Sequence, residues 1–193
     1  TTPLTTGIVI NESSTISILT LGDTTPVAIA ASKTLSGTIV VSSGGTLQLI
    51  DSGSLASEVT LNGGTLEITD QPTVSGLIRQ EASSTIKIVQ YAILSTSQAV
   101  DLNGYVLSLV GPGTFTNAEA FDLNPTSGLD LSQGVVVKGD IKMGGGVLRS
   151  SGDAEVSEAL SLSADASVQI ADAKTLTYSG PEVSIGQYTL TIA

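Results

Sequence analysis

Apolar and polar residues alternate in short segments along the whole chain. Segments such as Leu47-Gln48-Leu49, Leu66-Glu67-Ile68 and Leu107-Ser108-Leu109 direct every second side chain to one side. A period of two is typical of a β-strand with one buried face and one exposed face. Turn-forming glycines stand between the segments, as at Gly44-Gly45 and Gly63-Gly64. The pattern therefore predicts short strands joined by tight turns.

These segments recur in a fixed order about every 20 residues. Three apolar series, called faces A, B and C, run through the chain, and successive members of each lie 19 to 23 residues apart. Three short strands in each repeating unit predict one coil of a single-stranded parallel β-helix, an all-β solenoid. The members are Leu35, Leu55, Val74, Ile93, Phe115, Val136, Val156 and Leu176 on face A, Ile39, Val59, Ile78, Val100, Phe121, Ile141, Leu160 and Val183 on face B, and Leu47, Leu66, Ile86, Leu107, Leu129, Leu148, Val168 and Leu190 on face C.

The repeat continues without a linker, so one domain is predicted over residues 1–193, with regular coils over residues 31–193. Residues 1–30 fit less well and are expected to form an irregular first coil. Its strands would be Ile8-Val9-Ile10 on face A, Ile16-Ser17-Ile18 on face B and Val27-Ala28-Ile29 on face C. About nine coils at the spacing of paired strands predict a rod of roughly 43 Å.

Outward residues test the alignment of successive coils on face C. Stacking is expected to bring Glu67 beside Lys87 and Asp130 beside Arg149, so opposite charges meet. A column of threonines that includes Thr46 is also expected on this face. Such a column would suit ice binding, but Glu67 and Lys87 interrupt the plane.

Composition narrows the range of partners. The chain carries 7 basic and 18 acidic residues, a net charge of −11, which repels nucleic acid and anionic lipid. No run approaches the roughly 18 apolar residues of a membrane span, so neither nucleic-acid binding nor membrane insertion is expected. Charged residues are only 13% of the chain, and cysteine and histidine are absent. The absence of cysteine excludes disulfides and thiolate metal sites.

The repeat resembles the β-helical coils of secreted bacterial surface proteins. Autotransporter passengers and filamentous-haemagglutinin-type adhesins contain similar Gly-Gly-Thr-Leu-x-Leu stretches, like Gly44 to Leu49 and Gly63 to Ile68 here. The resemblance is one of pattern and implies a stiff stalk, adhesin or matrix, located extracellularly or at the cell surface. Those proteins are usually far longer than 193 residues.

Candidate chemistry is sparse. Without histidine there is no Ser-His-Asp triad, and there is no phosphate-binding loop, so no catalytic residue, no cofactor and no enzyme activity are expected. A polysaccharide-active enzyme is a minor alternative, because Asp101 and Asp122 could project from neighbouring coils. Asp51 and Asp70 follow face C segments and could share a Ca²⁺ ion, although a role as plain turn acids is favoured.

The last residues form a face C strand with no cap after it. Solenoid ends expose unpaired backbone groups, which normally require a cap. We therefore expect copies to stack head to tail into a homopolymeric filament, a contact that does not close on itself. A stalk fragment of a larger adhesin is the main alternative. The expected assembly strand consists of Tyr188, Thr189, Leu190, Thr191 and Ile192.

Overall fold

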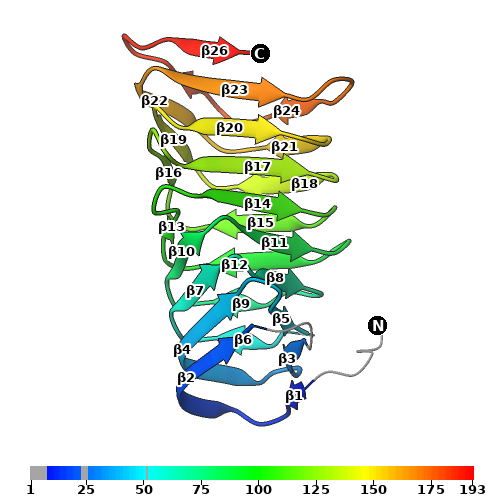
Figure 1. The fold of residues 1–193 in the computed structure, drawn as a ribbon. Helices are drawn as coiled ribbons and strands as arrows, with labels where there is room; N and C mark the ends of the chain where they lie inside the picture. The colour runs from blue at the N-terminus through cyan, green and yellow to red at the C-terminus, as the bar shows by residue number, and fades with distance from the viewer. Residues whose placement is uncertain (1–7, 23–25, 51) are drawn as a thin grey trace.

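The strands wind into a rod in which each coil lies on the one before it (Figure 1). The computed structural model describes residues 8–22, 26–50 and 52–193. Paired strands belong to successive coils and run parallel, and they form three sheets around about nine turns of some 20 residues each. The predicted fold class, a parallel β-solenoid with three strands in most coils, is confirmed.

Face C is one uninterrupted sheet along the rod. Its ten strands pair in the order in which they occur along the chain. They are β1 (Ile8–Ile10), β3 (Val27–Ile29), β5 (Thr46–Leu49), β8 (Thr65–Ile68), β11 (Ser84–Ile88), β14 (Val106–Val110), β17 (Gly128–Ser132), β20 (Val147–Ser150), β23 (Ala166–Ile170) and β26 (Leu190–Ile192).

One twelve-stranded sheet contains face A along the rod and face B in the first half of the rod. Two long strands, β2 (Ser14–Leu21) and β4 (Thr34–Ser42), cover both faces, and β4 pairs with a separate strand on each face in the next coil. Face A continues as β6 (Ser54–Leu55), β9 (Thr73–Val74), β12 (Ile93–Thr96), β15 (Thr114–Asn117), β18 (Val135–Lys138), β21 (Ala154–Val156) and β24 (Leu176–Tyr178).

Face B is interrupted halfway along the rod. Its first part continues from β4 through β7 (Val59–Asn62) and β10 (Ile78–Ala82) to β13 (Val100–Asp101). Its second part is a separate four-stranded sheet of β16 (Phe121–Leu123), β19 (Ile141–Gly144), β22 (Leu160–Ala164) and β25 (Val183–Ser184). The two parts are not paired with each other in the described chain.

The three faces enclose a single apolar core. Alternate side chains of each strand point inward and stack on the same position of the next coil, as Leu47 does on Leu66. The two phenylalanines pack inside with their ring centroids 5.4 Å apart. Burial of these side chains, at about 25 cal/mol for each Å² of apolar surface, is the main stabilising contribution to the rod.

Glycines allow successive coils to approach closely at the corners. A Cβ on Gly76 would collide with the backbone carbonyl of Ser57 in the coil below. Gly63, at a φ of 83°, adopts the left-handed conformation that side chains disfavour. The glycines of the repeat therefore permit both tight turns and the coil-to-coil spacing.

The face A series is corrected by one residue in two coils. Leu94 and Val137, rather than Ile93 and Val136, lie in the core and stack through Phe115. The neighbouring residues are apolar as well, so alternation does not indicate which side is buried. A one-residue slip moves every side chain of a strand to the opposite face, and only packing selects the correct one.

The face C series is corrected by two residues between β11 and β14. Ile86 pairs with Leu109, whereas Leu107 pairs with the buried Ser84. A shift of two keeps the same side chains inside, so the alternating pattern is equally consistent with both alignments.

The last coil shows the same kind of shift. Val168 pairs with Ile192 rather than with Leu190, and Leu176 pairs with Ala154.

The first coil also differs from the prediction. Ile8–Ile10 form a face C strand, not a face A strand, and pair with β3. Within β2 it is Leu19 that stacks on Ile39 of face B, whereas Ile18 points outward and is 69% exposed. The assignment of Val27–Ile29 to face C is confirmed. Face C therefore begins one strand earlier than the other two faces.

Candidate functional site

The strand edge at the C-terminal end of the rod is free on one side in the described structure. β26 pairs with β23, through bonds from Ala193 N to Val168 O at 3.0 Å and from Ile170 N to Ala193 O at 2.8 Å. Alternate residues of a parallel strand direct their backbone groups to opposite neighbours. The N–H and C=O groups of Leu190 and Ile192 therefore face away from β23, where a further strand could bind them.

Two of the five residues predicted for this strand lie in the turn before it. Thr189 donates its N–H to Asp165 Oδ1 at 2.7 Å, and Tyr188 N–H bonds to Ile185 O at 3.2 Å. Only Leu190, Thr191 and Ile192 of the predicted set form β26.

Apolar side chains gather beside this edge. Ile192 is 68% exposed although its position in the repeat points inward. Because no coil of the described chain covers them, residues of the last coil form a surface that we call the C-terminal plate. Its members are Leu176, Tyr178, Val183, Ile185, Tyr188, Leu190 and Ile192.

A second apolar surface lies at the opposite end of the rod, where β1 is the outermost strand of face C (Figure 1). We call it the N-terminal plate, and its members are Ile8, Ile10, Ile16 and Leu19. Sequence reasoning missed this surface, although the alternating segments of the first coil were the signal that could have indicated it.

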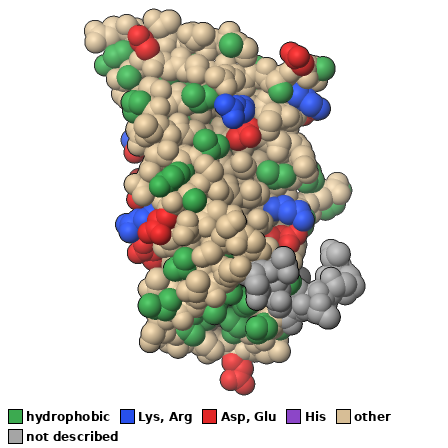
Figure 2. All heavy atoms as spheres, in the orientation of Figure 1, with side chains coloured by type: hydrophobic (Ala, Val, Ile, Leu, Met, Phe, Trp, Pro, Cys, Tyr) green, Lys and Arg blue, Asp and Glu red, His purple; other side chains and the backbone are tan. Residues whose placement is uncertain are grey.

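The sides of the rod carry few charges. Figure 2 shows one face on which uncharged polar groups and backbone predominate, and basic side chains lie next to acidic ones. On face C the predicted pair is confirmed, because Lys87 Nζ lies 2.8 Å from Glu67 Oε1. Gln48 Nε2 donates to Glu67 Oε2 at 2.7 Å. Burial disfavours the charged carboxylate, but these two hydrogen bonds and the lysine charge outweigh it and lower the pKa of Glu67.

The second predicted pair is adjacent but forms no ion pair. Asp130 and Arg149 are ladder partners, as expected. Arg149 instead donates to Gln169 Oε1 from Nε at 3.3 Å and from Nη2 at 3.1 Å. The Oδ1 atom of Asp130 is buried without a hydrogen-bond partner in the described structure.

Asp101 and Asp122, the carboxylates considered for a polysaccharide-active enzyme, each lie beside a basic residue. Asp101 binds Arg79, with Nε 3.3 Å from Oδ2, and Arg79 also binds Glu58 at 3.2 Å. One guanidinium thus links three successive coils. Asp122 stands beside Lys142 in the next coil. No ladder places Asp101 opposite Asp122, because face B is interrupted between their strands.

The predicted calcium site can be followed only in part. Asp51 lies outside the described residues. Asp70 accepts a bond of 3.4 Å from the Ser52 hydroxyl. Within residues 8–22, 26–50 and 52–193, no three acidic side chains come together in a way that could hold a metal ion.

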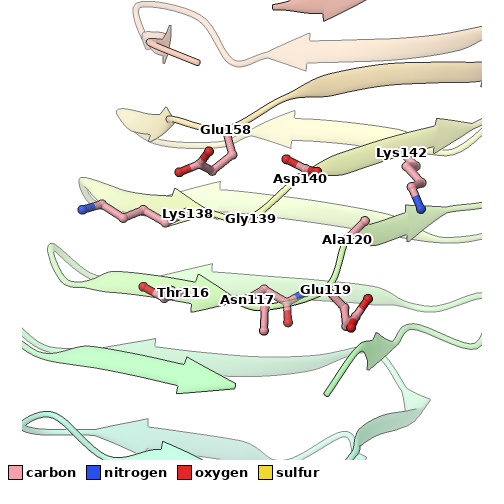
Figure 3. Close-up of a pocket in the computed structure, with 10 residues that line it drawn as sticks. Thr116, Asn117, Glu119, Ala120, Lys138, Gly139, Asp140, Lys142 and Glu158 are labelled. Carbon is pink, nitrogen blue, oxygen red and sulfur yellow. The ribbon is translucent and has the colours of Figure 1, made fainter. Parts of the chain in front are cut away.

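A shallow hollow of about 400 Å³ lies at the corner between faces A and B, beside residues 117–120 (Figure 3). It is lined by Glu119, Asp140 and Glu158 and by two lysines. These charged groups are spread around its rim and do not converge on one point (Figure 3). Asp140 is already engaged, because its Oδ1 accepts the Ala159 N–H at 3.2 Å. The arrangement is not that of a catalytic pair.

The described residues include no helix with the length and apolarity needed to cross a membrane. Comparison with known proteins finds no matching family model, no similar curated protein and no similar solved structure. The β-solenoid fold is thus shown by the structure alone, and the resemblance to bacterial surface proteins stays a resemblance of pattern.

Proposed function

We propose that this chain is a structural subunit of an extracellular filament, sheath or surface matrix, in which copies stack head to tail. One observation carries this function: each end of the rod combines an apolar plate with an unpaired face C strand edge in the described structure. Both features favour coverage by another β-coil, because exposed strand edges and apolar patches promote association.

The two strand edges have matching geometry. In β1, Ile8 N and Ile10 O bond to the β3 side at 3.1 and 3.0 Å, so the backbone groups of Val9 face outward along the rod. Val9 N–H and C=O can then pair with the outward groups of Leu190 and Ile192 in a second copy. In this register Val9 lies opposite Thr191, and Ile8 and Ile10 continue the inward columns.

The contact is heterologous, since different surfaces of the two copies meet. It preserves the parallel strand direction and extends face C through the filament. The rod has one polarity, so repeated contacts give an open filament rather than a closed ring.

The sides of the rod are consistent with a passive structural role, and we assign it no catalytic activity, cofactor, nucleic acid or membrane partner. The proposed location outside the cell rests on the resemblance of the repeat to secreted coils. In a stalk of a larger adhesin, the same edge of β26 would instead carry the next coil of its own chain.

A cysteine pair tests the contact, because the natural chain has no cysteine. In the double variant Val9→Cys with Thr191→Cys, the two thiols of neighbouring copies would face each other outside the core. Facing residues of paired strands lie about 5 Å apart at Cα, within the range that a disulfide spans. We expect a ladder of disulfide-linked oligomers on a non-reducing gel, and fibres by electron microscopy.

The matched control is Val9→Cys with Ser167→Cys. Ser167 is the ladder partner of Thr191 and lies one coil further from the end. Stacked copies would hold these thiols too far apart to react. Monodisperse monomers of both variants and of the natural chain at high concentration would overturn head-to-tail assembly and favour the stalk.

A further inference from the structure

Among the residues that the structure describes, the regular coils have one junction at which only two of the three faces are paired. We number the coils so that coil five contains β12, β13 and β14, and coil six contains β15, β16 and β17. Faces A and C continue across this junction through the β12–β15 and β14–β17 ladders. On face B the twelve-stranded sheet ends at β13 and the four-stranded sheet begins at β16.

Backbone hydrogen bonds show the same gap. In most face B strands the first residue donates to the next coil, as Phe121 N does to Asp140 O at 2.8 Å and Ile141 N to Ala159 O at 2.9 Å. Among the described residues, Ile78 makes no such bond to coil five, and Val100 makes none to coil six. Face B pairing is already short between coils four and five, where β10 and β13 share two residue pairs.

The gap extends around the corner. Coil five and coil six are joined by Ala118 N to Thr96 O at 3.2 Å and next by Gly128 N to Tyr105 O at 3.1 Å. No backbone bond between these two points links the described residues of the two coils. At the edge of the gap the Thr96 hydroxyl donates to Asn117 Oδ1 of coil six at 2.6 Å. The three ion pairs of the described chain all lie among coils three, four and five and do not cross the junction.

One feature disfavours pairing at this junction. The corner has the same length in both coils, because Thr96 pairs with Asn117 and each lies four residues before the face B strand of its coil. A closed ladder in the register of the repeat would bring Asp101 opposite Asp122, and like charges directly opposite are destabilising. The core still crosses the junction, since Leu102 and Phe121 are both buried.

We propose that the junction of coils five and six is the mechanical joint of the rod, at which face B opens before any other internal part of the solenoid. Faces A and C then act as the hinge, and the rod bends there under load. This property belongs to the single chain and does not depend on end-to-end stacking.

Hydrogen exchange on the full chain tests the joint. Alternate residues of each strand face the gap, and these are Val100, Leu102, Asp122 and Asn124. Their amides should exchange about tenfold faster than the hydrogen-bonded amides of β7 and β19 on the same face. Hydrogen-bonded amides of β12, β14, β15 and β17 in the same two coils should stay protected. Equal protection of the four gap-facing amides and the amides of β7 and β19 would overturn the inference.

Limited proteolysis with a Glu-specific protease gives an independent readout. Glu119 and Glu158 are both exposed and both precede a face B strand. β22 after Glu158 pairs with β19 of the preceding coil, whereas β16 after Glu119 has no partner in the preceding coil. Of these two sites we expect the first cut after Glu119, and its loss in a Glu119→Gln variant. A first cut after Glu158, or simultaneous cuts at both sites, would contradict a joint at coil six.

Discussion

Replacing Leu107 by aspartate tests the buried side of face C in the middle of the rod. Leu107 is fully buried in β14, where it stacks between Ser84 and Leu129. Neither neighbour is basic, so an aspartate at this position would have no ion-pair partner in its column. The new carboxylate must either stay charged in the core or force the coil open.

The magnitude follows from two contributions. Losing a fully buried leucine side chain costs about 2–5 kcal/mol, including the cavity that remains. An unpaired carboxylate in the core adds several kcal/mol more. The sum is comparable to the entire stability of a typical domain, about 5–15 kcal/mol. Leu107→Asp should therefore unfold coil five and its neighbours.

The adjacent Ser108 provides controls on the outward side of the same strand. The alternation by itself predicts that Ser108→Asp has little effect, but the ladder places Ser108 directly opposite Asp130. We expect Ser108→Asp to cost up to about 1 kcal/mol through like-charge repulsion, and Ser108→Lys to be neutral or slightly stabilising.

The assay is urea unfolding followed by circular dichroism and tyrosine fluorescence. The order expected for loss of stability is Leu107→Asp far above Ser108→Asp, with Ser108→Lys last. Equal urea midpoints for Leu107→Asp and Ser108→Asp would refute the assignment of inward and outward positions on face C.

Three further variants test individual contacts. Glu67→Gln should lower stability near neutral pH by roughly 1 kcal/mol. Because folding lowers the pKa of Glu67, its contribution is present above the usual carboxyl value and is lost as the pH falls through the folded value, so the variant should lose this part of the acid dependence. Arg79→Ala removes two half-exposed ion pairs and should cost below about 1 kcal/mol in urea unfolding. Gly76→Ala pushes a methyl group into the Ser57 carbonyl and should cost about 3 kcal/mol in thermal unfolding.

Each of these variants has a contrasting outcome. Gly44→Ala is the control for Gly76→Ala. Gly44 has a φ of 84°, but a Cβ added to it would have no non-neighbouring atom closer than 3.7 Å, so this variant should cost about 1 kcal/mol. Equal losses would remove the role assigned to close approach at Gly76. An Arg79→Ala loss that persists in high salt would contradict its ionic origin. An unchanged acid dependence in Glu67→Gln would exclude Glu67 as its source.

Contacts between successive coils could be predicted from the sequence where they follow the repeat. The Glu67–Lys87 pair and the exposed edge of β26 follow from the period, since stacking in a solenoid converts a spacing of about 20 residues into direct contact. The Arg149 partner was not predictable, because its long side chain can reach Asp130 or Gln169 and only packing selects between them.

The interruption of face B was not predictable either. Val100 and Phe121 fit the repeat as well as any other pair, and nothing in their spacing separates a paired strand from an unpaired one. Whether two strands close a ladder depends on the charges that would then meet, here those of Asp101 and Asp122. The repeat places Val100 and Phe121 at equivalent positions of successive coils, so the period alone does not indicate whether their strands pair.

The class of fold, the length of the repeat, the three faces and the number of about nine coils could be derived from the amino-acid sequence, because each inward position has an apolar residue in nearly every unit. Three features needed the folded structure: the burial of Leu94 and Val137, the two-residue shift at Leu107 and the assignment of β1 to face C. Alternation has a period of two, so a shift by two residues leaves the pattern unchanged. Where the residues on both sides are apolar, a shift by one also leaves it unchanged, and the packing of side chains between coils selects the register.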